Sequence, residues 1–262
     1  MVVEGARTRA LRARKQRQRR RTMLAAGLLT VAALVAVAGL IRFGRGPAVP
    51  AAGAGTAPSS SAPAPEPAAA SFPVNGPNTF TFAAGSDEVL GAGTAGIKSF
   101  RLAVENNSGQ DVAAFTQVVR RVLGDPRGWT AGGDVRFQLV GKDAPGVQFT
   151  ITLATQATTD KLCAAGGVHI EQFASCRLPG QLVLNLTRWL TAIPGYGAPL
   201  DEYRAYEINY AVGRELGHAN EACPNPGRPA PVMQKQVLGL KGCVANGWPY
   251  RDGLRYQGPP VP

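Results

Sequence analysis

The side chains best suited to chemistry in this 262-residue chain lie in one stretch, residues 203–233, YRAYEINYAVGRELGHANEACPNPGRPAPVM. Pro199 followed by Asp201 and Glu202 predicts the start of a helix, which we expect to run to Leu216 and to end at Gly217. Because successive helical residues are about 100° apart, one stripe of this helix is apolar and is expected to face the core. The stripe consists of Ala205, Ile208, Val212 and Leu216.

The opposite side of the predicted helix carries tyrosines and charged groups. Such a face is too polar for a core and too aromatic for a plain solvent surface, so we expect it to line a cleft. On this face lie Tyr203, Tyr206, Glu207, Tyr210, Arg214 and Gly217, with His218 and Met233 as further candidates for the cleft.

Residues 209–220, NYAVGRELGHAN, resemble the pattern N-H-E-V-G-H-x-L-G-H-x-H of an actinobacterial family of membrane-anchored ectodomains of unknown function. That family is similar to the metzincin branch of zinc metallopeptidases. The resemblance implies an α+β fold of zincin type, with a mixed sheet, an active-site-type helix and a Met-turn. Further motifs occur in the family's order: DPRGW at 125–129, SCR at 175–177, RW at 188–189, APVM at 230–233, Cys243, and WP at 248–249.

The resemblance also implies which positions would carry zinc chemistry, and here the sequence departs from the family. In such a site three histidines hold the metal and a glutamate activates the bound water. Tyr210, Arg214 and Asn220 stand at the ligand positions and Ala211 at the general-base position, while the turn glycine, Gly217, is retained. Arginine brings a fixed positive charge and alanine cannot accept a proton. We therefore expect no zinc, although related proteins bind it, and no inherited catalysis.

Two hypotheses describe what replaces the metal. Tyr210 and Arg214 are one turn apart on one face, so a guanidinium can stack on the phenol ring, and Glu207 can offset the charge. This predicts a Tyr-Arg-Glu cluster that fills the vacated zinc pocket. The alternative is an arginine that only covers the helix surface. Met233 would form a hydrophobic floor beneath the site, although a lone methionine is often ordinary core packing.

A rebuilt metal site is the competing hypothesis, and it would make the protein an active hydrolase. The chain has two histidines, His169 and His218, and the neighbouring Glu215 and Glu221 offer an unorthodox ligand set with His218. A simpler interpretation places His218 partly exposed beyond the helix end and His169 in a strand-like segment. Neither histidine lies in a recognisable nucleophile signature, and the sequence contains no glycine-rich phosphate loop.

All four cysteines follow the apolar segment described below, and an even number in an exported domain predicts two disulfides. The simplest pairing joins sequence neighbours, Cys163 with Cys176 and Cys223 with Cys243, although four cysteines allow three pairings. A zinc knuckle is disfavoured because the sequence has no C-x-x-C pair and an oxidising compartment disfavours free thiolates.

The positive charge is concentrated at the N-terminus. Residues 1–45 hold 11 of the 28 Lys and Arg residues and one of the 17 Asp and Glu residues, which leaves the rest of the chain at +1. A nearly neutral folded part gives no electrostatic reason to expect nucleic-acid binding. Residues 1–22 are predicted to be a basic cytoplasmic tail, and the uncharged residues 23–41 a transmembrane helix. A cleaved signal peptide is the alternative.

The chain beyond the apolar segment divides into a linker and a domain. Residues 42–71 are rich in Ala, Pro, Gly and Ser, which predicts a disordered tether. Residues 72–262 are expected to form one extracytoplasmic α+β domain. Its predicted elements are a strand at 98–105, a helix at 111–123, a hairpin made by 135–140 and 147–154, and a strand at 181–189.

These features together predict a single-pass membrane protein whose extracytoplasmic zincin-like domain has lost catalysis. We expect it to bind an unknown protein or peptide partner in the former substrate cleft, or to act as a scaffold of the cell envelope. The alternatives are the rebuilt metallopeptidase or other hydrolase, and a regulator of an intact family member.

Overall fold

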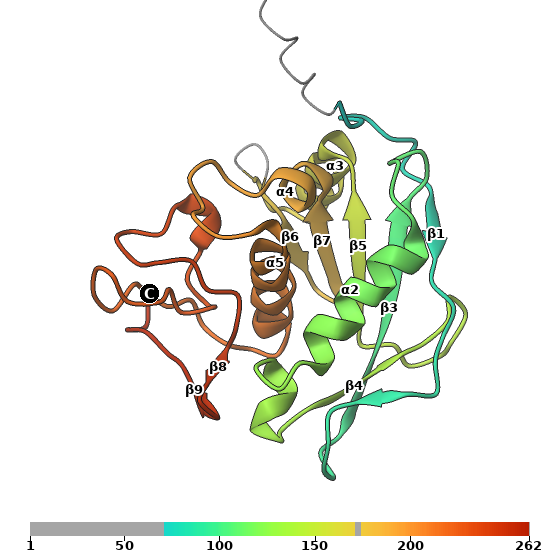
Figure 1. Ribbon diagram of the computed structural model, residues 1–262. Helices are drawn as coiled ribbons and strands as arrows, with labels where there is room; N and C mark the ends of the chain where they lie inside the picture. The colour runs from blue at the N-terminus through green and yellow to red at the C-terminus, as the bar shows by residue number, and fades with distance from the viewer. Residues whose placement is uncertain (1–70, 171–173, 262) are drawn as a thin grey trace, which may run out of the picture. The chain divides into compact units, whose positions relative to one another are not determined.

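A seven-stranded mixed sheet lies at the centre of the computed structural model, which describes residues 71–170 and 174–261. The strands follow the order β2-β4-β3-β5-β7-β6, and β1 also pairs with β3 (Figure 1). β3 runs parallel to β4 and β5, and β5 runs parallel to β7, whereas β1, β2 and β6 are antiparallel to their partners. The strands are β1 (Phe80–Phe82), β2 (Val89–Leu90), β3 (Ile97–Glu105), β4 (Arg136–Leu139), β5 (Phe149–Ala154), β6 (Cys176–Leu178) and β7 (Gln181–Asn185).

Helices cover both faces of this sheet, and all described elements belong to the compact unit Pro67–Pro262. Leu182 and Leu184 of β7 join the large core with α2, α4 and α5, whereas Val183 points to the other face and packs with Cys163 of α3. The fold is therefore a mixed α/β fold. The helices are α2 (Val112–Gly124), α3 (Gln156–Ala165), α4 (Leu186–Thr191) and α5 (Leu200–Glu215), with 3-10 helices η1 (Trp129–Gly132) and η2 (Gln236–Leu238) and a hairpin of β8 (Tyr250–Arg251) and β9 (Leu254–Arg255).

The predicted strand at 98–105 and helix at 111–123 are confirmed as β3 and α2. Helix α2 begins where expected because the Asp111 side chain accepts a hydrogen bond from the Ala114 N–H at 2.7 Å. Its apolar residues face the core, since Phe115 and Val119 are buried.

The predicted hairpin of 135–140 and 147–154 is wrong. β4 and β5 lie on opposite sides of β3 and are both parallel to it. The loop between them contains turn residues, but it carries the chain past β3 rather than back along β4. The predicted strand at 181–189 is also too long, because Asn185 ends β7 and caps α4 by accepting from the Thr187 N–H at 2.9 Å.

Helix α5 begins and ends close to the predicted positions, but its surroundings differ from those predicted. Ala205, Ile208 and Val212 of the apolar stripe are buried, as expected. Tyr203, Tyr206 and Glu207 on the opposite side are buried as well. Tyr203 is therefore core and does not line the predicted cleft, whereas Tyr206 and Glu207 are buried but also line a small cavity beside the helix.

Segments on both sides of α5 in the chain cover this face: Tyr196 packs on Tyr203 at a ring-centroid distance of 4.9 Å, and the Ser175 hydroxyl donates to Glu207. The chain after α5 lies beside the helix in Figure 1. The Val237 N–H of η2 donates to the Tyr206 hydroxyl at 3.4 Å. A Cβ added to Gly247 would lie 2.6 Å from the Glu202 carbonyl oxygen, so only glycine permits this close approach of the backbone. The side chain of Asn209 donates to the Gly247 carbonyl at 2.8 Å. Sequence periodicity within α5 contains no information about the other segments that pack on it.

Both predicted disulfides are confirmed. Cys163 of α3 is joined to Cys176 of β6, and Cys223 to Cys243 within the C-terminal segment. The zinc-knuckle alternative is thereby excluded, because all four sulfur atoms are used. The Cys163–Cys176 bond fixes α3, which the sequence did not predict, to the last strand of the sheet.

The predicted basic tail at 1–22, the transmembrane helix at 23–41 and nearly all of the linker at 42–71 lie outside the described residues. Among the residues that are described, none of the helices is long and apolar enough to cross a membrane.

Candidate functional site

The three positions predicted to replace zinc ligands lie together at the C-terminal end of α5. The Tyr210 hydroxyl donates to Asn220 Oδ1 at 3.0 Å, and Arg214 Nη1 donates to the His218 carbonyl at 2.6 Å. Gly217 stands between them with φ of 93°, a left-handed conformation that glycine adopts without strain. The turn at Gly217 therefore brings Asn220 back onto the face of Tyr210.

The predicted Tyr-Arg-Glu cluster does not form, because Glu207 points to other partners. Its carboxylate accepts hydrogen bonds from the Tyr203 hydroxyl at 2.9 Å and from the Ser175 hydroxyl. In the described part of the chain, no carboxylate lies within ion-pair distance of Arg214. Tyr210 and Arg214 instead make separate polar contacts with the chain beyond the helix.

Glu207 is an unusual group to find in a core. Burial raises the pKa of its carboxyl group, and the hydrogen bonds from Ser175 and Tyr203 and the charge of Arg188 oppose this shift only in part. Burial likewise raises the pKa of Tyr203 and Tyr206, with the charge of Glu207 adding to the effect. These hydroxyls therefore stay protonated and act as hydrogen-bond partners.

Tyr210 differs because it is only partly buried and lies nearer to Arg214. Burial raises its pKa to about 12, and the Arg214 charge lowers it while the Glu207 charge raises it. At neutral pH its hydroxyl is protonated and donates to Asn220.

A cavity of about 50 Å³ remains between α5 and β6, where an open cleft was predicted. Ser175 and Val237 contribute to its wall, and they also cover Glu207 and Tyr206. Ser175 was expected only as part of the SCR motif, and Val237 was not a candidate. Neither residue carries a local sequence signal that marks it as part of the site. The lining residues are Ser175, Cys176, Arg177, Tyr206, Glu207, Tyr210, Ala211, Arg214 and Val237.

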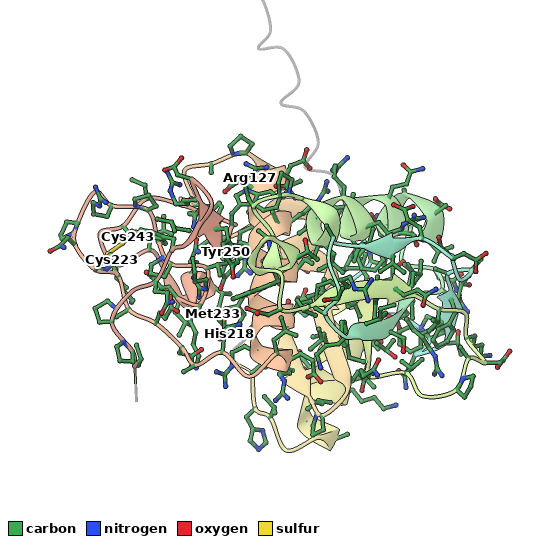
Figure 2. All side chains as sticks on the ribbon, turned by 90° about the horizontal axis from the view of Figure 1, so that it is seen from below. Arg127, His218, Cys223, Met233, Cys243 and Tyr250 are labelled. Carbon is green, nitrogen blue, oxygen red and sulfur yellow. A yellow bond between two sulfur atoms is a disulfide. The ribbon has the colours of Figure 1, made fainter. Side chains whose placement is uncertain are left out.

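Met233 lies beside α5, on the side of the C-terminal segment (Figure 2). It is fully buried, and a Cβ added to Gly213 would approach its Sδ to 2.5 Å. Met233 was predicted to form a hydrophobic floor beneath the site. In the structure its side chain packs closely against Gly213 of α5.

His218 lies away from the cavity. Its ring stacks on Trp129 at a centroid distance of 4.2 Å, and the guanidinium of Arg255 lies 4.9 Å from the Trp129 ring. Burial and the Arg255 charge lower the pKa of His218, which favours the neutral ring at pH 7.

A comparison with protein families shows which family this chain belongs to. A family described as "Protein of unknown function (DUF3152)" matches residues 66–247. The chain belongs to the DUF3152 family. Neither the curated proteins nor the solved structures contain a match. The matched region includes the sheet, α5, the Gly217 turn and Met233, so the site lies within the family's shared domain.

The side chains of the alternative metal site, Glu215, His218 and Glu221, do not point toward a common centre in this DUF3152 domain. Glu215 forms an ion pair with Arg177 at 2.8 Å, and Glu221 forms one with Arg255 at 2.8 Å. His218 stacks on Trp129 instead of facing either carboxylate. Within residues 71–170 and 174–261, no group of three or more His, Cys, Asp or Glu side chains is placed to hold a metal ion.

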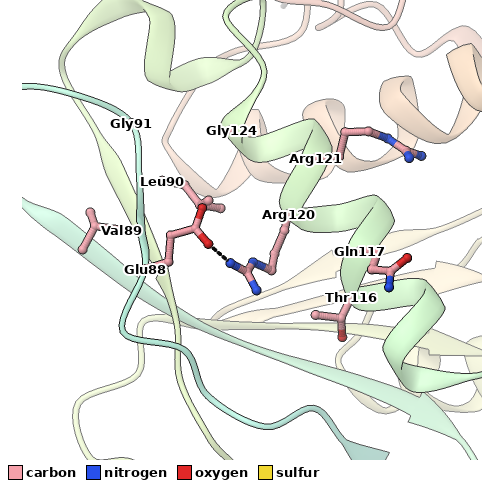
Figure 3. Close-up of a pocket in the computed structure, with 9 residues that line it drawn as sticks. All are labelled: Glu88, Val89, Leu90, Gly91, Thr116, Gln117, Arg120, Arg121 and Gly124. Carbon is pink, nitrogen blue, oxygen red and sulfur yellow. Dashed lines mark hydrogen bonds and ion pairs between the residues drawn. The ribbon is translucent and has the colours of Figure 1, made fainter.

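A larger groove of about 500 Å³ lies between α2 and the β2 segment (Figure 3). Arg120 on its wall forms an ion pair with Glu88, and Arg121 points away from this pair. The groove is open and polar, and the one charge pair within it is already neutralised. It offers no arrangement comparable to the converging side chains at the end of α5.

Proposed function

We propose that this DUF3152 protein is a membrane-anchored, non-catalytic binding protein of the cell envelope, with a zincin-like domain that binds an extended peptide segment of a partner. The observation that carries the proposal is the 3.0 Å hydrogen bond from Tyr210 to Asn220. Two positions that the resemblance assigns to zinc ligands are hydrogen-bonded to each other instead.

The arrangement around α5 supports a zincin-type origin. The helix packs against the antiparallel edge strand β6, and the chain turns back at Gly217 so that Asn220 faces Tyr210. Met233 then packs against the helix at Gly213. This is the order of helix, glycine turn and Met-turn that the sequence resemblance implies.

The chemistry of the substituted positions supports a loss of catalysis. The guanidinium of Arg214 cannot lose its proton to become a metal ligand, and it would repel a zinc ion. Ala211 lines the cavity and has no group that accepts a proton from water.

The edge of the sheet supports peptide binding. β6 is the last strand in the sheet order and has β7 as its only strand partner within the described residues. An extended peptide can add to such an edge through main-chain hydrogen bonds, while a neighbouring pocket selects a side chain. The cavity between β6 and α5 is placed to receive that side chain.

The proposed location rests on sequence and on the disulfides. The basic residues 1–22 and the apolar residues 23–41 favour an anchor with a cytoplasmic N-terminus, followed by the tether at 42–71. Disulfides at Cys163–Cys176 and Cys223–Cys243 are typical of an oxidising compartment, which supports an extracytoplasmic domain.

Metal content and peptide cleavage test the loss of catalysis. The full-length protein, purified in mild detergent, is expected to contain no stoichiometric zinc and to leave a mixed peptide library uncut. The His218→Ala variant is the comparison, because His218 is the histidine nearest the former site. Stoichiometric zinc that disappears in this variant would show that a rebuilt metal site exists and that the proposal is wrong.

Restoring the ligands tests the zincin-type frame directly. Tyr210→His, Arg214→His and Asn220→His in one chain are expected to create a site for about one zinc ion. The double variant without Asn220→His is the matched control, and it should bind zinc more weakly because one ligand is missing. A folded triple variant that takes up no more zinc than the double variant would contradict the proposed frame.

A further inference from the structure

We propose that Arg214 binds the C-terminal carboxylate of the partner peptide, whose last side chain enters the cavity between β6 and α5. This inference rests on the proposed function, because it identifies the ligand of the same groove. In a zinc peptidase the metal would polarise a carbonyl group inside the peptide chain. Here the guanidinium of Arg214 would instead bind the carboxylate at the end of the peptide.

Arg214 differs from the other arginines near the site in lacking a carboxylate partner among the described residues. Arg177 pairs with Glu215, and Arg255 pairs with Glu221. Arg214 is partly exposed, and its one hydrogen bond runs from Nη1 to the His218 carbonyl. The remaining N–H groups of its guanidinium are thus available to a carboxylate, which an arginine binds through two parallel hydrogen bonds.

The cavity sets the size of the side chain that enters it. A volume of about 50 Å³ exceeds the roughly 10–15 Å³ that one water molecule requires and is well below the roughly 150 Å³ of a cavity that binds benzene, which suits a small aliphatic side chain. Its wall includes Tyr206, Ala211 and Val237, and both oxygens of Glu207 already accept hydrogen bonds. The site therefore favours a small uncharged residue such as alanine.

The same dimensions favour a terminal carboxylate over the side chain of aspartate or glutamate. An acidic side chain inside the cavity would face the carboxyl group of Glu207, and two like charges in one small site disfavour each other. At the end of a peptide, the carboxylate stays outside at Arg214 while the side chain of the same residue enters the cavity.

Three fluorescein-labelled pentapeptide libraries with four randomised positions test the inference on the full-length protein by fluorescence polarisation. One library ends in alanine with a free carboxylate, the second ends in alanine amide, and the third ends in aspartate amide. The carboxylate library is expected to bind at least about tenfold more tightly than either amide library, because charge-assisted hydrogen bonds are lost in the amides.

Variants at two positions separate the cation from the cavity. Arg214→Ala should weaken binding of the carboxylate library by about 10- to 100-fold, and Arg214→Lys should retain part of the affinity. Ala211→Leu fills the cavity and should weaken binding of both alanine libraries. Arg228→Ala removes an exposed arginine outside this site and is expected to change nothing.

The outcomes distinguish this inference from the proposed function. Equal binding of the carboxylate and amide libraries, lost in Ala211→Leu, would overturn carboxylate capture and leave peptide binding in place. Tightest binding of the aspartate amide library would assign Arg214 to an acidic side chain and would also overturn the inference. No binding of any library would overturn both proposals.

Discussion

The two halves of α5 differ in what surrounds them, although their sequences are similar in character. In the first half, Tyr203, Tyr206 and Glu207 are buried and hydrogen-bonded inside the core. In the second half, Tyr210 and Arg214 are partly exposed and contact the chain beyond Gly217. Aromatic and charged residues thus stabilise the fold at one end of the helix and form the site at the other.

The difference shows that a helix face has no single role along its length. Tyr203, Tyr206 and Glu207 in the first half are contacted by other segments of the chain. Arg214 in the second half is partly exposed. Truncation of Tyr203 in the first half is therefore expected to change stability most, and truncation of Arg214 in the second half is expected to change binding most.

The largest effect is expected at Tyr203. Tyr203→Ala removes a fully buried ring that packs against Tyr196 at 4.9 Å and donates to Glu207. Such truncations cost about 3–5 kcal/mol in the free energy of unfolding, which chemical denaturation measures. The matched substitution in the second half, Arg214→Ala, should cost no more than about 1 kcal/mol. Equal losses would remove the distinction between the two halves.

A smaller loss is expected where α5 packs on Met233. Gly213→Ala places a Cβ 2.5 Å from Met233 Sδ and 2.5 Å from a Trp129 ring carbon, so the packing must shift at a cost of about 1–3 kcal/mol. Gly124→Ala at the end of α2 is the control, because its nearest neighbour, Leu90, lies at an ordinary 3.5 Å. A Gly213→Ala variant as stable as this control would mean that Met233 does not pack tightly there.

The pH dependence of stability probes the buried carboxyl group. Because burial raises the folded-state pKa of Glu207 above 4.5, its contribution is fully present below the unfolded pKa and is lost as the pH rises through the folded pKa. The melting temperature of Glu207→Gln minus that of the natural protein should therefore increase from about pH 4 to about pH 8, because only the natural protein loses stability as Glu207 ionises.

Ser175→Ala sharpens this test. The Ser175 hydroxyl donates to Glu207 and lowers its pKa, so its removal should raise the pKa further and extend the loss of stability to higher pH. A melting-temperature difference between Glu207→Gln and the natural protein that does not vary with pH would show that Glu207 stays in one protonation state.

The smallest effect is expected at the hydrogen bond between Tyr210 and Asn220. Tyr210→Phe removes the donor to Asn220 and should cost about 1 kcal/mol, because the pair is only partly buried. A double-mutant cycle with Asn220→Ala should give a coupling energy of about 0.5–1.5 kcal/mol. Additive single losses would indicate that the two side chains do not interact.

The failures of sequence reasoning have particular physical causes. Alternating residues predicted that 135–140 and 147–154 are extended, but strand pairing depends on which strand lies between them, and β3 does. Helix α3 was missed because QATTDKLCAA is polar and has a weak helical pattern; its position depends on the disulfide and the back face of the sheet.

The sequence by itself determined the elements whose signals are local: β3, α2 with its Asp111 cap, and α5 with its Gly217 turn. It also determined which residues stand at the positions that the resemblance assigns to zinc ligands, and proximity along the chain favoured the correct disulfide pairs. Only the tertiary structure decided that Glu207 faces Ser175 rather than Arg214, and that half of a polar helix face is core. The reason is that burial depends on segments far along the chain, which close over one end of α5 and leave the other end open.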